Sequence, residues 1–126
     1  MMNLLKIGKH FQKFMVLLAI CGLVSGCASV DITKTSSGFY DPTDPNTVEI
    51  LKTRPDRKFE ELGDLTVTGF DSTETAKMHN AIRAKAAELG ADAVIITQDG
   101  LTPAGFGYKR WATGVAIKYK SVEKSK

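Results

Sequence analysis

The stretch DSTETAKMHNAIRAKAAELGADAVIIT, residues 71–97, decides the fold, because it predicts one helix followed directly by one buried strand. Asp71 and Glu74 have the spacing of a capping box, which marks the start of a helix. Gly90 can adopt the positive φ that a helix end often requires. We therefore expect a helix from Asp71 to Leu89. Its apolar residues are spaced four, four and three apart, as a single stripe requires: Met78, Ile82, Ala86 and Leu89.

Four strands are expected around this helix, each with its own pattern. Val94 to Ile96 are consecutive apolar residues, which is typical of a central strand covered on both faces. Leu65 and Val67 alternate with threonines, as in a strand with one face buried. The glycine-rich segment 99–107 is expected to be a loop or hairpin between the last two strands. The predicted strands span residues 47–53, 65–69, 91–97 and 109–120.

The order of these elements predicts an α+β domain over residues 47–120. The economical arrangement is a two-layer sandwich (β-β-α-β-β), in which one helix packs on a small four-stranded sheet. The other face of the sheet is then left to water or to another chain. Alternation along the last strand places one set of side chains on a common face: Trp111, Thr113, Val115, Ile117 and Tyr119.

An export signal is expected at the N-terminus. Residues 1–13 contain three lysines, and residues 14–24 form an apolar run of 11 residues without charge. A membrane-spanning helix needs ~20 residues, whereas this length fits the apolar region of a signal peptide. The run ends in Leu23-Val-Ser-Gly-Cys27, which resembles the bacterial lipobox. The resemblance implies that residues 1–26 are a cleaved signal peptide and that Cys27 carries N-palmitoyl and S-diacylglycerol groups.

The lipid on Cys27 would attach the mature chain to a bacterial membrane. Ala28, rather than aspartate, follows the cysteine. By the same resemblance this implies the outer membrane, or the cell membrane if the host is Gram-positive. Residues 27–46 are rich in Ser, Thr, Asp and Pro and are expected to form a flexible tether, with a short edge strand over residues 30–33 as the alternative. Residues 121–126 are expected to be a frayed tail.

Charge and composition narrow the classes of function. Three of the 17 basic residues lie in the signal peptide, which leaves 14 against 14 acidic residues and predicts no general attraction for nucleic acid. Past the signal the chain has one histidine, His79, and no free thiol, so no catalytic triad, metal site or cofactor is expected. Asp41, Asp44 and Asn46 are expected to form a turn, and Asp92 to accept a local hydrogen bond from backbone amides. The sequence therefore favours a protein that is not an enzyme.

Aromatic and basic residues near the end of the chain form the candidate interaction surface: Phe106, Tyr108, Arg110 and Trp111. Aromatic residues and arginine are enriched at binding hot spots. We expect this surface to contact an envelope protein or the cell wall. The alternative is that the aromatic rings fold down over the open edge of the core.

Two short stretches, IRAKA at residues 82–86 and LGADAV at residues 89–94, carry a family resemblance. They resemble the RcsF/YbjQ-like group of small bacterial proteins, and the likeness extends over residues 48–94. It implies a small α/β sandwich with a role in binding, sensing or assembly, and it implies homo-oligomers, because some members are thought to form rings. We therefore expect a lipid-anchored envelope protein acting as a non-catalytic module. The alternatives are a homo-oligomeric structural module and a small-ligand carrier or enzyme.

Overall fold

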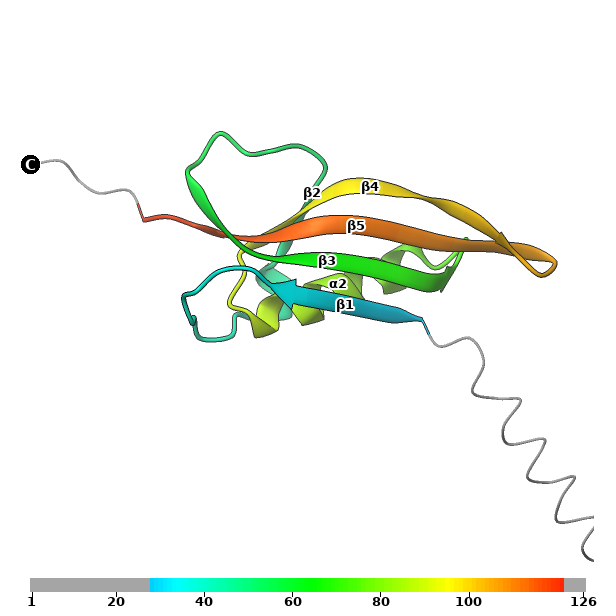
Figure 1. The fold of residues 1–126 in the computed structure, drawn as a ribbon, viewed down its shortest axis with the longest axis horizontal. Helices are drawn as coiled ribbons and strands as arrows, with labels where there is room; N and C mark the ends of the chain where they lie inside the picture. The colour runs from blue at the N-terminus through cyan, green and yellow to red at the C-terminus, as the bar shows by residue number, and fades with distance from the viewer. Residues whose placement is uncertain (1–27, 122–126) are drawn as a thin grey trace, which may run out of the picture.

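One helix lies against one face of a five-stranded sheet within residues 28–121, the part of the chain that the computed structural model describes (Figure 1). A single 3-10 turn, η1, precedes the second strand. The elements are β1 (Ser29–Lys34), η1 (Pro45–Thr47), β2 (Glu49–Leu51), β3 (Phe59–Asp71), α2 (Thr75–Glu88), β4 (Ala93–Ala104) and β5 (Gly107–Tyr119).

The strands lie in the order β1-β3-β5-β4-β2, with β2 parallel to β4 and all other neighbours antiparallel. The expected α+β class is confirmed, but the expected count of four strands is wrong. The fifth strand is β1, which comes from the segment that the composition predicted to be a tether. Val30 is 8% exposed and pairs with Val67 of β3, so alternate side chains of β1 reach the core. The edge strand given as the alternative for residues 30–33 is therefore the correct one.

Helix α2 is shorter than the sequence predicted, because the capping box forms only in part. The carboxylate of Glu74 accepts a hydrogen bond from the backbone N–H of Asp71 at 3.1 Å. The side chain of Asp71 turns instead toward Lys109, at 3.7 Å, and the helix begins at Thr75. The predicted stop is confirmed, since Gly90 has a φ of 80°. Four residues of the helix are buried against the sheet: Met78, Ile82, Ala86 and Ala87.

Strands β4 and β5 form a long hairpin through the segment 99–107, for which the sequence predicts a loop or hairpin between shorter strands. Cross-strand pairing continues as far as Ala104 and Gly107, so only Gly105 and Phe106 lie between the strands. Gly105 has a φ of 60°, and no residue other than glycine among those described has a positive φ. This is the pattern of a type II′ turn, whose twist matches that of the flanking strands and lets the ladder continue.

The face of the sheet away from the helix is partly covered, which corrects the expectation of a free face. Arg54 and Arg57, in the connection from β2 to β3, lie over aromatic rings at one end of this face. The Arg54 guanidinium is 4.9 Å from the centroid of the Phe59 ring, and that of Arg57 is 4.0 Å from the centroid of the Tyr119 ring. These rings pack against a small buried cluster: Ala93, Ile95 and Ile117. The remainder of the face carries polar side chains, among them Asp31, Thr66 and Thr113, and the half-buried Trp111.

Candidate interaction surface on the β4–β5 arm

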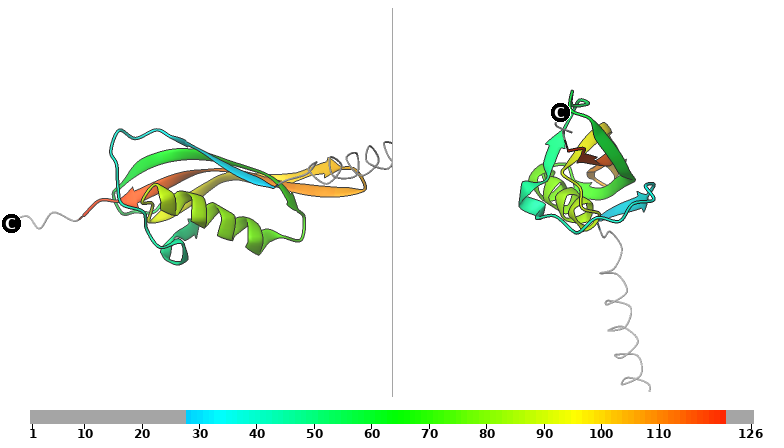
Figure 2. Two further views of the ribbon diagram at one scale, coloured as in Figure 1. Left: turned by 90° about the horizontal axis from the view of Figure 1, so that it is seen from below. Right: turned by 90° about the vertical axis from the view of Figure 1, so that its left-hand side faces the viewer.

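The end of the β4–β5 hairpin projects beyond the rest of the sheet as a two-stranded arm (Figures 1 and 2). Pairing between β2 and β4 ends at Ile95, and pairing between β3 and β5 ends at Lys109. Residues 100–108, called the arm below, therefore lie past the end of β2, and residues 103–108 extend past β3 as well. Pro103 fits this position, because a proline is tolerated in a strand that has no neighbour on its outer side.

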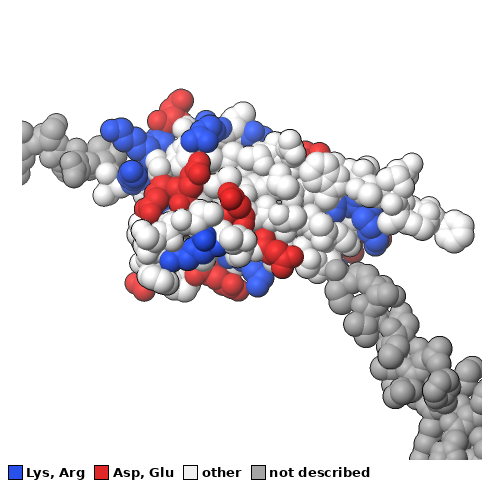
Figure 3. Space-filling view, in the orientation of Figure 1, with Lys and Arg blue, Asp and Glu red and all other residues white. Residues whose placement is uncertain are grey.

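The arm exposes most of the large apolar side chains found on the surface. Phe106 is fully exposed, and Tyr108 and Leu101 are 55% and 48% exposed. Phe39 is the fourth such side chain among the described residues, and it belongs to the connection from β1 to η1, which lies at the opposite end of the sheet (Figure 1). Figure 3 shows the arm as an uncharged projection, and its sequence, GLTPAGFGY, contains no ionisable group apart from the tyrosine hydroxyl.

The four residues of the predicted interaction surface do not converge on one patch. Residues paired across strands share a face, so Tyr108 and Arg110 point to the side of the sheet that carries α2. Trp111, paired with Gly100, points to the opposite side, and Phe106 stands at the tip. Leu101 pairs with Arg110 and joins the first face. Sequence reasoning missed Leu101, because its neighbours become known only once the register of the hairpin is set.

The alternative, in which the aromatic rings cover the edge of the core, is wrong for Phe106 and Tyr108, and Trp111 packs on Gly100 of the arm and not on the core clusters. Phe106 and Tyr108 are exposed and do not cover the core. Trp111 is half-buried and lies across the root of the arm. A Cβ atom added at Gly100 would come within 2.9 Å of the Trp111 indole nitrogen, so the ring occupies the space that this glycine leaves open.

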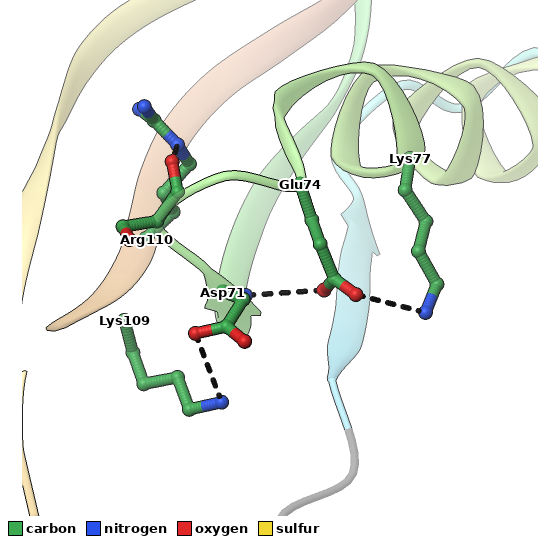
Figure 4. A network of polar contacts seen from close by, with 6 residues as sticks. Asp71, Glu74, Lys77, Lys109 and Arg110 are labelled. Carbon is green, nitrogen blue, oxygen red and sulfur yellow. Dashed lines mark hydrogen bonds and ion pairs between the residues drawn. The ribbon is translucent and has the colours of Figure 1, made fainter. Parts of the chain in front are cut away.

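Polar contacts hold the base of the arm against the start of the helix (Figure 4). The Nε of Arg110 donates a hydrogen bond of 2.7 Å to the backbone carbonyl of Ser72, and Lys109 faces Asp71. The pKa of Glu74 is lowered, first by the hydrogen bond from the backbone of Asp71 and then by nearby lysines. Exposed ion pairs add little stability, but together with the bond from Arg110 they connect the base of the arm to the segment before the helix.

The polar residues that the sequence singled out elsewhere have structural partners. The Asp92 carboxylate accepts a hydrogen bond of 2.9 Å from the backbone N–H of Tyr119 and lies 3.9 Å from Lys118. The partner is a backbone amide, as expected, but it lies on the distant strand β5 and is not local. The Asp44 carboxylate accepts one of 2.9 Å from the N–H of Asn46, as expected for a turn. His79 is half-buried on α2, where burial, followed by nearby positive charges, lowers its pKa.

A cluster of metal-ligating side chains and a membrane-spanning helix are both absent from the described part of the chain. Within residues 28–121, no three His, Cys, Asp or Glu side chains gather in a way that could hold a metal ion. No helix in the same range has the length and hydropathy needed to cross a membrane. The predicted signal peptide and the predicted lipid on Cys27 lie outside the described residues, as do residues 122–126 of the predicted tail.

Comparison with known proteins supports the fold. No family model and no curated protein matches the chain. Among solved structures, the chain is similar to the crystal structure of FvfA, a Francisella virulence factor. The TM-score is 0.53 at 19% sequence identity, and the match covers 71% of this chain and 97% of the other. At this identity the likeness concerns the arrangement of helix and strands only. The resemblance to the RcsF/YbjQ-like group stays a prediction.

Proposed function

We propose that this protein is a lipid-anchored bacterial envelope protein that acts as a non-catalytic binding module, with the arm as its contact element. One observation carries the proposal: the arm holds three exposed large apolar side chains on a paired hairpin that contributes no residue to the buried clusters of the described chain. Exposed apolar groups gathered on one projection are typical of a contact surface. The aromatic side chains supply contact area at a small cost in conformational entropy.

The proposed anchor is the N-palmitoyl and S-diacylglycerol-modified Cys27, after removal of residues 1–26. More than one acyl chain gives stable attachment, whereas a single chain binds a membrane only marginally. With Ala28 after the cysteine, the proposed location is the outer membrane, or the cell membrane of a Gram-positive host. Attachment to a surface raises the effective concentration of the domain toward partners at that surface.

Photo-crosslinking in intact cells tests the binding proposal. A photoreactive amino acid replaces Phe106 in the full chain, and the matched control carries it in place of Phe39, which is similarly exposed at the other end. We expect a discrete crosslinked species from position 106 and none from position 39. Identification by mass spectrometry then separates an envelope protein, a lipid or a second copy of the chain. Equal, diffuse crosslinking from both positions would contradict a role for the arm.

A further inference from the structure

The arm and the start of β1 lie at the same end of the molecule (Figure 1). Val30 pairs with Val67, Val67 with Ala112, and Ala112 with Asp99, so these residues form one row across the sheet. Ser29 lies about one residue from this row toward the arm, and the tip at Phe106 lies about five residues further. At ~3.4 Å per residue, the tip extends roughly 17 Å past the start of β1 along the strand direction.

The proposed lipid attachment site is close to this end in sequence. Cys27 precedes Ser29 by two residues, and two residues span at most ~7 Å. Because β1 belongs to the sheet, little free chain separates the anchor from the domain. Acyl chains on Cys27 would therefore hold this end of the sheet at the membrane. The tip of the arm then reaches roughly 10 Å further in the same direction, which compares with the ~5–10 Å that interfacial segments penetrate.

We infer that the arm inserts Phe106 into the interface of the bilayer that holds the lipid on Cys27. The inference rests on the proposed function, since it takes the lipid anchor as given and names the bilayer as the surface that the arm contacts. Phenylalanine at the tip enters the apolar boundary, and Tyr108 behind it has the amphipathic ring that suits the headgroup level. Anchor and arm together give the domain two points of attachment and hence a defined orientation.

Apolar insertion, rather than attraction to anionic lipid, drives this contact. The cations nearest to the arm already have partners: Lys109 faces Asp71, and Arg110 binds the carbonyl of Ser72. The arm itself is uncharged (Figure 3). Insertion should therefore change little with salt concentration, whereas contacts made by basic residues weaken as salt screens them.

The test measures the depth of a probe near the tip in the lipidated protein. The mature, lipidated chain is reconstituted in vesicles of phosphatidylethanolamine and phosphatidylglycerol, with an environment-sensitive fluorophore on Gly107→Cys. A Cβ atom at Gly107 meets nothing within 4 Å, so this label leaves Phe106 in place. A label on Asp56→Cys, in the connection at the other end, is the control. We expect quenching by spin-labelled lipid at position 107 and none at position 56.

A second measurement tests whether the Phe106 ring itself is required for insertion. With the label at position 107, Phe106→Ala should lower the ratio of inserted to free arms about tenfold, in line with the loss of a buried phenylalanine ring. Phe39→Ala should leave the ratio unchanged. An unquenched probe on a vesicle-bound protein would overturn the inference, and the proposed function would still stand if position 106 crosslinks to a protein. A protein that carries no lipid would instead refute the proposed anchor, and the inference with it.

Discussion

Glycines show most directly how single residues set local geometry in this chain. Gly90 ends the helix with a positive φ, as the sequence predicted, but it has a second role that depends on tertiary structure. A Cβ atom at Gly90 would lie 2.6 Å from the Cβ of Tyr40 and 2.7 Å from the carbonyl oxygen of Asp41. The connection between β1 and η1 therefore packs directly on the end of the helix. Only a residue without a side chain satisfies both requirements.

Gly90→Ala should lower the free energy of unfolding by about 1–3 kcal/mol, because the left-handed conformation is strained for alanine and the methyl group has no room. Chemical denaturation of the two proteins measures the difference. Gly107→Ala is the matched control: its φ is not in the positive range and its Cβ meets nothing within 4 Å. We expect that variant to stay within about 0.5 kcal/mol of the parent. A similar loss of stability in both variants would contradict the requirement for glycine at position 90.

At the scale of elements, composition misled the prediction in one segment, where the edge strand given as the alternative is correct. Residues 28–46 are polar on average, yet Val30 is buried and Ile32 packs against the core. Two inward side chains suffice for an edge strand when a partner with a matching register, here β3, is already present. The glycines of segment 99–107 likewise suggested a loop, but the strand pairing continues through them. Gly105 forms the tight turn, and Gly100 leaves room for the Trp111 ring. Local sequence alone did not reveal either partner.

Val30→Ala tests whether β1 belongs to the folded domain. Removal of two buried methyl groups should cost about 1–2 kcal/mol of the free energy of unfolding. Thr33→Ala on the exposed face of the same strand should change it by less than about 0.5 kcal/mol. Chemical denaturation of both variants provides the comparison. If Val30→Ala were as harmless as Thr33→Ala, the segment would behave as the tether that its composition suggests.

The whole molecule is elongated, and its two ends differ in character (Figure 2). One end carries the uncharged arm and the first residues of β1. The other carries the arginines over Phe59 and Tyr119 and the connection that contains Phe39. This polarity arises because β4 and β5, with 12 and 13 residues, are much longer than β2, with three. An anchor at Cys27 would place the arm end toward the membrane.

Cys27→Ala tests the proposed anchor for the whole protein. Cells that express the variant are given a palmitate analogue, and its incorporation into the protein is measured. We expect the label to be lost, because the lipobox resemblance assigns both the thioether and the acylated amine to this residue. Cys21→Ala, in the apolar run of the signal, should still incorporate the label. Continued labelling of the Cys27→Ala variant would show that the lipid is attached elsewhere or that the lipobox interpretation is wrong.

Local sequence determined the helix, its apolar stripe, its glycine stop, the alternation along the last strand and the α+β class. These follow from short-range periodicity and backbone conformation, which neighbouring residues express without help from the rest of the chain. Tertiary structure decided the fifth strand, the length of the hairpin and the separation of Trp111 from Tyr108 and Arg110. Each depends on which distant strand is the partner and in what register, and a shift of one residue reverses the face that every side chain occupies.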